Sequence, residues 1–414
     1  MTDRWPRQIL FGDIDAMFAS AAVLADPSLA GKPVAVGGPP PRGIIAAASY
    51  ALRRFGVRSA MPTIQALRLC PHLILVPPDR PLYRRLHRRL QEVTDRFFPA
   101  TEWTSIDEFY AETTTLQTRH PDPTALGVAL KAAIREATGL TCTIALATGK
   151  TVAKIAADAH KPDGLAVITP GSEAAFLGPL PLRSLPGIGP KSAESVERLG
   201  LRIIADLLEP RFAPLLTHLL GTRLAPLRAL AGGQDTEPVV AGRESKSVSY
   251  ETTFEEDTDD PALLEPVVHG FLEQLAHDLR LEGLAAGSFT VKLKDAHFHI
   301  TTRQRRFPTA LNYDPAMWPD IRRALNGLMQ PRMRYRLVGL GLSDLVPAPE
   351  PLFDRRQRDA VAALDQLIER HGSHVVRLGG LPQGKEGAPT RRGGVTRRPG
   401  RGRGIDSHDD LPLR

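Results

Sequence analysis

The stretch Thr104-Ser105-Ile106-Asp107-Glu108-Phe109-Tyr110 places two adjacent carboxylates inside an apolar and aromatic run. Two neighbouring acids repel each other, so a fold rarely half-buries such a pair in a turn without a cation nearby. A second acidic stretch, FGDIDAMF at residues 11–18, follows apolar residues and also has the character of a strand. We predict strands over 8–18 and 102–112, whose acids meet at one end of a sheet. Carboxylates arranged in this way are a usual means of holding two Mg²⁺ ions for phosphoryl transfer.

The alternative interpretation is that each acid caps a turn or the start of a helix. For either acidic pair alone, capping is the more common explanation. The two pairs together, combined with the phosphate-binding features described below, favour a metal site.

Length and composition suggest a protein of several domains that has a nucleic-acid partner. The chain has 414 residues, 42% of them hydrophobic, and a net charge of +7, which fits two to four domains with substantial cores. A pI near 9.6 is compatible with binding nucleic acid. The two cysteines, Cys70 and Cys142, are far apart and lack metal-ligand spacing. No signal peptide or long apolar run is found, so we expect a cytoplasmic protein without a membrane span.

Two stretches outside the acidic strands have the chemistry of a polyphosphate site. If residues 50–54 form a helical turn, Tyr50 and Arg53 share one face, and a guanidinium grips phosphate oxygens in a forked geometry. Lys161 lies in a turn that Pro162 and Gly164 constrain, from which its ammonium can reach a phosphate. The alternative for Tyr50 and Arg53 is a solvated helix face.

The segment from about 170 to 235 is predicted to be helical and contains LPGIGPKSA at residues 185–193. A turn of the form Gly187-Ile188-Gly189 between short helices exposes backbone N–H groups to a phosphate of a nucleic-acid backbone. We include Lys191, at the start of the next helix, in this surface. A plain tight turn between helices is the alternative.

After a linker at 234–244, residues 245–345 are predicted to form a compact β-α-β-β-α-β module. We expect strands at 245–254, 287–294, 297–306 and 334–343, with helices at 261–282 and 315–329. Its strands carry basic side chains that we expect on one face of the sheet, as a surface for DNA backbone: Lys246, Lys292, Lys294, Arg303, Arg305 and Arg306. Ordinary solvent-facing charge is the alternative.

From residue 346 the composition changes. A Pro-rich link is followed by a predicted short helix at 355–371 and then by a Gly-, Pro- and Arg-rich tail that we expect to be disordered.

Taken together, several motifs resemble those of the Y-family translesion DNA polymerases, of the bacterial DinB or DNA polymerase IV type. The matching stretches keep the family's order and span most of residues 8–343: DIDAMFAS at 13–20, SYALRRFGVRSAMP at 49–62, SIDEFY at 105–110, KIAADAHKPDG at 154–164, LPGIGPKSA at 185–193 and SKSVSYETTF at 245–254.

This resemblance implies an α+β right-hand polymerase that adds dNTPs to a primer on template DNA with low processivity and low fidelity. It implies a palm at 1–18 and 79–168, fingers at 19–78, a helix-hairpin-helix thumb at 169–233 and a little finger at 245–345. We expect a monomer that acts in DNA damage tolerance and mutagenesis.

The resemblance also implies roles for individual residues. Asp13 and Asp107 would bind both Mg²⁺ ions, Glu108 would bind or position the metal near the primer 3′-hydroxyl, and the Ile14 carbonyl would complete one ion's shell. Phe18 would exclude a ribose 2′-hydroxyl. Tyr50, Arg53 and Lys161 would hold the triphosphate.

The chain departs from the family pattern near the nucleotide site. The run Ala46-Ala47-Ala48 stands where the family usually has a hydroxyl residue, Leu52 replaces a smaller residue, and Met17 stands where an aromatic residue is common. These changes bear on rate and lesion preference and leave the expected reaction unchanged.

The resemblance further implies binding to a sliding clamp through a short C-terminal peptide. Leu352-Phe353 and the segment His408–Leu413 each keep part of the expected pattern, and both lack its Gln. The peptide at 408–413 is favoured because it lies near a free end.

Three rival functions are a non-catalytic paralogue, a plain DNA-binding protein and a metalloenzyme of the nucleotide cyclase type. The first would have lost the acids, the second would not need them, and the third has no use for the basic module.

Overall fold

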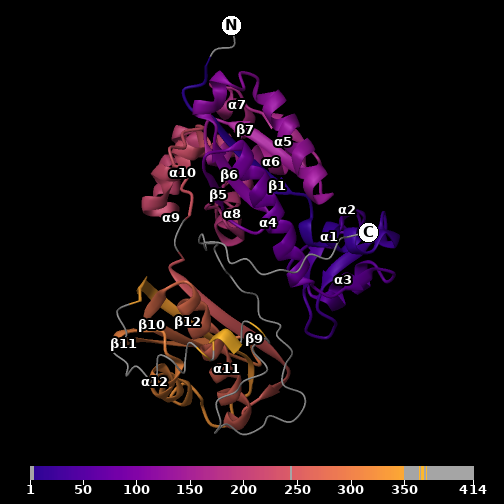
Figure 1. The fold of residues 1–414 in the computed structure, drawn as a ribbon. Coiled ribbons are helices and arrows are strands. Elements are labelled where there is room, and N and C mark those ends of the chain that lie inside the picture. The colour runs from indigo at the N-terminus through magenta and orange to yellow at the C-terminus, as the bar shows by residue number, and fades with distance from the viewer. Residues whose placement is uncertain (1–3, 243–244, 349–362, 364, 368–369, 371–414) are drawn as a thin grey trace. The chain divides into compact units, whose positions relative to one another are not determined.

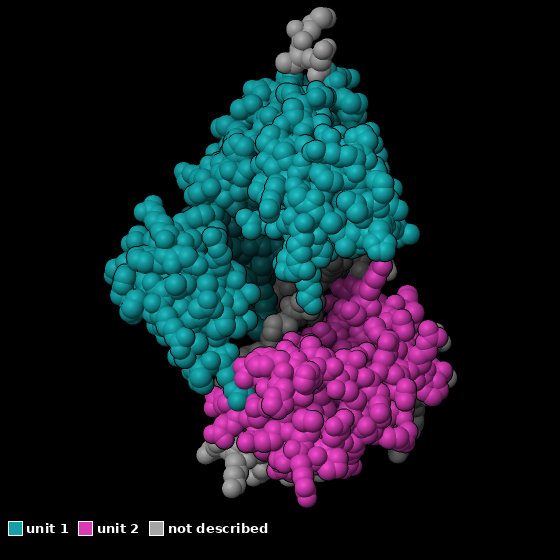
Figure 2. Space-filling model, turned by 180° about the vertical axis from the view of Figure 1, so that it is seen from behind, with its two compact units in different colours: residues 1–243 teal, residues 244–414 magenta. Residues whose placement is uncertain are grey.

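The computed structural model describes residues 4–242, 245–348, 363, 365–367 and 370, which Figure 1 shows as ribbon. The chain forms two compact units, Met1–Arg243 and Glu244–Arg414, coloured separately in Figure 2. Both clamp-peptide candidates and the Arg-rich tail lie outside the described residues. Within the predicted helix at 355–371, the described residues are helical.

Unit 1 is built around a five-stranded sheet whose order is β5-β6-β1-β7-β8. Its strands are β5 (Thr101–Trp103), β6 (Glu108–Glu112), β1 (Ile9–Ile14), β7 (Cys142–Ala147) and β8 (Leu165–Val167). The three inner strands are buried almost throughout because helices cover both faces of the sheet. β1 runs antiparallel to β6 and to β7, and β7 runs parallel to β8.

The two faces of this sheet belong to different hydrophobic clusters. On one face, Leu10, Phe109 and Ile144 pack against the apolar stripes of α4 (Arg80–Phe97) and α5 (Pro123–Thr138). On the other, Phe11 and Tyr110 pack against α6 (Lys150–His160). Side chains therefore alternate along β1 between two helical layers, one on each face of the sheet.

A smaller sheet and a helical part complete unit 1. The smaller sheet has the strand order β3-β2-β4. Its strands are β3 (Ile45–Ala48), β2 (Val34–Gly37) and β4 (Ile74–Val76). Its helices are α1 (Met17–Ala25), α2 (Tyr50–Arg53) and α3 (Thr63–Leu69). The helical part comprises α7 (Glu173–Leu177), α8 (Pro190–Glu197), α9 (Ala213–Leu220) and α10 (Leu224–Ala231). Short 3₁₀ turns lie at Pro27–Leu29, Thr114–Thr118, Leu182–Ser184, Ile204–Leu208, Pro210–Phe212 and Gly221–Arg223.

Unit 2 confirms the predicted β-α-β-β-α-β order. Its elements in sequence are β9 (Ser247–Thr258), α11 (Pro261–Leu281), β10 (Leu284–Asp295), β11 (Ile300–Leu311), α12 (Asp314–Asn326) and β12 (Tyr335–Pro347). The sheet order is β11-β10-β12-β9, so β11 is an edge strand. Both helices pack on the sheet face that carries Phe289, Val291 and Leu340.

The predicted end of the first strand is wrong. The strand expected over 8–18 ends at Ile14, and α1 begins at Met17. Ala16 between them has φ 46°, in the left-handed region, and this reverses the chain direction. The second acid of this stretch, Asp15, therefore lies in a turn, and Phe18 lies on a helix.

Both cysteines are unpaired and buried. In the described part of the chain, every helix is too short or too polar to cross a membrane.

Candidate active site

The three predicted metal-binding acids meet at one end of the central sheet. Asp13 on β1 lies directly opposite Glu108 on β6 in the antiparallel register, and the backbone N–H of Ile14 donates to the Asp107 carbonyl over 3.0 Å. Gly12 makes this approach possible, because a Cβ there would lie 2.3 Å from the Phe109 ring. The adjacency of the strands was predictable from the acidic runs, whereas the register that pairs Asp13 with Glu108 comes from the structure.

Two lysines contact these carboxylates. Lys161 Nζ lies 2.5 Å from Asp13 Oδ2 and 2.8 Å from Asp158 Oδ1. Lys154, on α6, lies 2.5 Å from Glu108 Oε1. The hydroxyl of Ser105 donates to Asp107 Oδ1. Among the described residues, no three His, Cys, Asp or Glu side chains are grouped closely enough to hold a metal ion as they stand. Lysine ammonium groups contact two of the carboxylates named here.

The electrostatics of the acids suit a cation. Burial raises the pKa of Asp13 to about 7, and Asp107 and Glu108 act in the same direction against the Lys161 ammonium. Burial also raises the pKa of Asp107. A divalent ion would relieve the cost of keeping these carboxylates charged, and carboxylate and carbonyl oxygens are the ligands that Mg²⁺ prefers. The carboxylates of Asp13, Asp107 and Glu108 therefore fit as oxygen donors for such an ion.

Tyr50 and Arg53 share one face of α2, as their spacing predicts. The Arg53 guanidinium lies 4.4 Å from the centre of the Tyr50 ring, and its Nε donates to the Ala48 carbonyl. Ser49 caps the helix by accepting a hydrogen bond from Leu52 N–H. The Arg53 guanidinium therefore lies against the Tyr50 ring, and the hydrogen bond to Ala48 uses its Nε and not its two terminal nitrogens.

Phe18 lies in the first turn of α1 and stacks on Tyr83 of α4, with ring centroids 4.2 Å apart. Tyr83 is 5% exposed and supports the Phe18 ring from behind. This stacking supports the ring of Phe18 on one side.

The predicted backbone-binding turn lies where the sequence indicated, between a 3₁₀ turn and α8. Gly187 has φ 93°, a conformation that other residues adopt only with strain. Gly189 precedes the first residue of α8, and a Cβ added there would meet no atom within 4 Å. Lys191 is exposed on the first turn of this helix.

The expectation of one shared basic face in unit 2 is wrong for Arg303 and Arg305. Arg303 pairs with Val291 and Arg305 with Phe289, so both lie on the face that the helices cover. Lys292 and Lys294 occupy the alternate positions of β10, on the open face. Period-2 spacing within one strand could not reveal this, because the face is set by pairing across the sheet.

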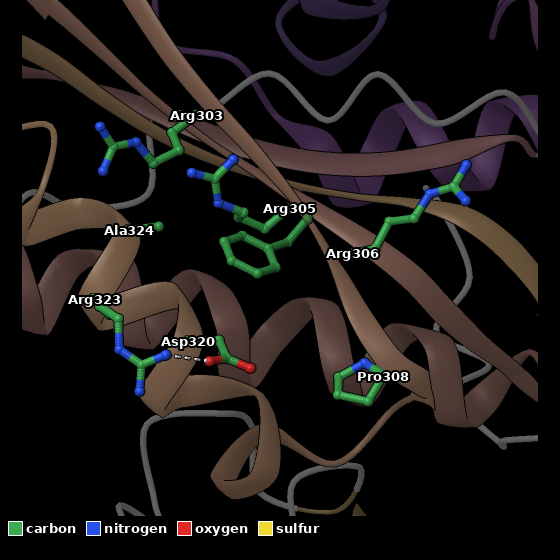
Figure 3. Close-up of a pocket in the computed structure, with 8 residues that line it drawn as sticks. Arg303, Arg305, Arg306, Pro308, Asp320, Arg323 and Ala324 are labelled. Atoms are coloured by element: carbon green, nitrogen blue, oxygen red, sulfur yellow. Dashed lines mark hydrogen bonds and ion pairs between the residues drawn. The ribbon is translucent and has the colours of Figure 1, made fainter.

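Arg303 and Arg305 instead line a groove of about 340 Å³ between edge strand β11 and α12 (Figure 3). Arg323 of α12 faces this groove and is paired with Asp320 over 3.0 Å. Arg306 also lines this groove, although its partner on β10 is Ser288, one position along from Phe289. Lys246 is exposed just before β9.

Two residues near the acids were missed by reasoning from the sequence. Lys154 is seven residues before Lys161, which is about two helical turns. This spacing could have indicated that both lysines lie on the same side of α6 and the residue that follows it. Asp15 is 2% exposed and accepts hydrogen bonds from groups distant in the sequence, which no local pattern discloses.

Comparison with known proteins assigns the same regions to one family. Family models described as the impB/mucB/samB family, its HHH motif and its C-terminal domain match residues 12–158, 170–201 and 245–378. The chain is 41% identical to a DNA polymerase IV of Methanoculleus marisnigri, over 82% of this chain and 94% of the relative. It is 37% identical to a DNA polymerase IV of Halorhodospira halophila, over 86% and 99% of the two chains.

Solved structures of polymerases share the fold. A Y-family DNA polymerase chimera of Dbh and Dpo4 has a TM-score of 0.74 at 26% identity, covering 82% of this chain and 99% of that one. An insertion ternary complex of Dbh DNA polymerase has a TM-score of 0.61 with the same identity and coverage. The family models match most of this chain, and its relatives are matched over nearly their full length. This chain therefore belongs to the impB/mucB/samB family of Y-family DNA polymerases.

Proposed function

We propose that this chain is a template-directed DNA polymerase of the translesion type, which extends a primer 3′ end with dNTPs. The observation that carries the proposal is the register that sets Asp13 opposite Glu108, with Asp107 beside them and Lys161 in contact with Asp13. The relatives named DNA polymerase IV support the same reaction.

In this proposal the protein's own side chains divide the work. Asp13 and Asp107 would hold two Mg²⁺ ions, Glu108 would bind or position the metal that serves the primer 3′-hydroxyl, and the Ile14 carbonyl would add a ligand. When bound, such ions lower the pKa of the attacking hydroxyl and offset negative charge at the phosphates. The 3′-hydroxyl gives its proton to solvent, its oxygen bonds to the α-phosphorus in line, and the bond from that phosphorus to pyrophosphate breaks.

The remaining residues hold the nucleotide. Lys161 exchanges its contact with Asp13 for a phosphate oxygen, while Arg53 and Tyr50 bind the rest of the triphosphate. Phe18, braced by Tyr83, occupies the space that a ribose 2′-hydroxyl would need.

For primer-template DNA, we propose that the Gly187–Gly189 turn with Lys191 binds backbone phosphates, together with the open face and the β11 edge of unit 2. Lys246 contributes from just before β9, and Arg303 and Arg305 contribute from the groove between β11 and α12. The palm, fingers, thumb and little-finger boundaries predicted from the sequence, the monomeric state and a cytoplasmic location are part of the same proposal.

Primer extension tests the proposed reaction. The wild-type protein with Mg²⁺ should add single dNTPs to a primer on undamaged and damaged templates. Asp107→Ala should abolish incorporation, because it removes a shared metal ligand, while the dissociation constant for primer-template stays close to that of the wild type. An Asp107→Ala protein that extends primers at the wild-type rate would contradict the assignment.

A sliding clamp is the proposed protein partner, bound through residues 408–413 or Leu352-Phe353. Deleting residues 408–414 should remove the stimulation of synthesis by the clamp and leave clamp-free extension unchanged. Unchanged stimulation would exclude the C-terminal peptide, and substitution of Leu352 and Phe353 by Ala would then test the other.

A further inference from the structure

Asp15 is a buried carboxylate for which the proposed chemistry has no role. It lies two residues beyond Asp13, in the turn between β1 and α1, and is 2% exposed. A buried carboxylate is costly unless hydrogen-bond donors surround it, so its donors indicate what it is there to hold.

One set of donors comes from the turn that carries Lys161. The backbone N–H of Asp163 donates to Asp15 Oδ2 over 2.8 Å, and the Thr143 hydroxyl of β7 donates to Oδ1 over 2.9 Å. The Thr143 oxygen in turn accepts from the Gly164 N–H over 3.3 Å. Asp163 has φ 52°, in the left-handed region, so these bonds hold a strained backbone.

The same turn is held from its outer side. The Asp163 carboxylate lies 2.9 Å from Lys131 and 2.9 Å from Arg135, both on α5. Asp15 therefore contacts the turn through the Asp163 backbone, and α5 contacts it through the Asp163 carboxylate. Together these contacts restrain the backbone next to Lys161.

A third donor comes from the small-sheet part of unit 1. The Tyr50 hydroxyl lies 3.5 Å from Asp15 Oδ1, and the Tyr50 ring carries the Arg53 guanidinium. One carboxylate thus contacts Tyr50 directly and supports the loop of Lys161. These are the residues, with Arg53, to which the proposed function assigns the triphosphate.

We propose that Asp15 is a positioning residue that sets the spacing between the Tyr50–Arg53 pair and Lys161, and so determines the affinity for the triphosphate of the incoming nucleotide. The inference rests on the proposed function, whose residues it supports. Asp15 touches neither the substrate nor the reacting atoms. Its effect is on the geometry with which three separate groups meet one polyphosphate.

The test uses the full-length protein and Asp15→Asn, which keeps the shape of the side chain. An amide has one oxygen and one NH₂ group, so it cannot accept hydrogen bonds on both sides as the carboxylate does. The expected result is a KM for dNTP raised by about tenfold or more, with kcat changed by less than about threefold. The dissociation constant for primer-template should stay within about twofold of the wild-type value.

Asp314→Asn is the matched control, since Asp314 is also a buried aspartate, 4% exposed, but lies in unit 2. It should leave the KM for dNTP unchanged. A double-mutant cycle then asks whether Asp15 acts through Tyr50. Tyr50→Phe removes only the hydroxyl, and combining it with Asp15→Asn should raise KM by less than the product of the single effects.

A second pair of variants guards against an Asp15→Asn protein that does not fold. Thr143→Val removes the hydroxyl that bonds Asp15 and should also raise the KM for dNTP, whereas Thr143→Ser should restore it. An unchanged KM for dNTP in Asp15→Asn would overturn the inference, even if the melting temperature of that variant is lowered. If Asp15→Asn does not fold, an unchanged KM in Thr143→Val would overturn it instead. A wild-type protein without incorporation would instead refute the proposed function.

Discussion

At the scale of single residues, the site depends on which charged groups are paired before substrate arrives. Lys161 and Lys154 neutralise Asp13 and Glu108 at short range. The lysines therefore stabilise a carboxylate cluster that would otherwise repel itself.

Phe18 offers a prediction at this scale. Phe18→Ala should increase incorporation of rNTP relative to dNTP, because removing the ring opens the space beside the sugar. Single-nucleotide extension with matched dNTP and rNTP measures the ratio of kcat/KM values.

Tyr83→Leu is the informative companion, since it withdraws the ring that stacks on Phe18 while leaving Phe18 in place. It should give a smaller shift in the same direction. If Phe18→Ala gained no use of rNTP, Phe18 would not be the residue that excludes ribose.

At the scale of elements, α4 supports the turn that carries Asp107. His87, on α4, has Nδ1 2.9 Å from the Ile106 carbonyl, and because a carbonyl only accepts, Nδ1 carries the proton. The His87 ring also meets Trp103 edge to face, with centroids 4.6 Å apart. This contact anchors the acidic turn to the helix behind it.

The buried position of His87 predicts a pH dependence. Burial lowers the pKa of His87 below its ordinary value of 6.5. As pH falls below 6.5, the unfolded chain takes up a proton that the folded protein resists, so the free energy of unfolding decreases. Stability linked to this group is therefore complete above pH 6.5 and declines as the pH falls toward the lowered pKa.

His87→Gln should remove this part of the pH dependence, because a neutral amide does not titrate. Urea unfolding at pH 7.5, 6.5 and 5.5 compares the two proteins. The wild type should lose more stability than the variant between pH 6.5 and 5.5, and parallel losses would count against the assignment.

At the scale of the whole chain, the predicted linker is in part fastened to unit 1. Lys150 of α6 lies 2.6 Å from Glu102 and 3.3 Å from Glu237, and Glu102 also accepts from the Val240 N–H. The Thr151 N–H donates to the Asp235 carboxylate over 2.7 Å. Residues 235–240 thus belong to the fold of unit 1.

Lys150→Met should destabilise unit 1, because it leaves the Glu102 carboxylate, 3% exposed, without its ammonium partner. Breaking a buried pair in this way costs about 3–5 kcal/mol. Urea unfolding of the full-length protein measures the loss, and hydrogen exchange should rise in α6 and β5.

Replacing both partners, Lys150→Met with Glu102→Leu, should recover part of that loss, since both charges of the buried pair are then removed. A single variant as stable as the wild type would show that the pair contributes nothing.

The sequence by itself determined the order of the elements of unit 2, the two acidic strands, the face shared by Tyr50 and Arg53, and the turn at Lys161. These features follow from local rules: apolar periodicity, helical spacing and the turn preferences of Gly and Pro. The family was indicated separately, by the resemblance of motifs such as those at residues 13–20, 105–110 and 154–164.

Only the tertiary structure decided the register of β1 against β6, the opposite faces of Lys292 and Arg303, and the contacts of Asp15 with Thr143 and Asp163. Register and face depend on which residues of different strands pair, and a slip of one position reverses every side chain. The bonds of Asp15 join residues up to 148 positions apart. Such contacts leave no periodic trace in the sequence, because they form only when separate elements pack together.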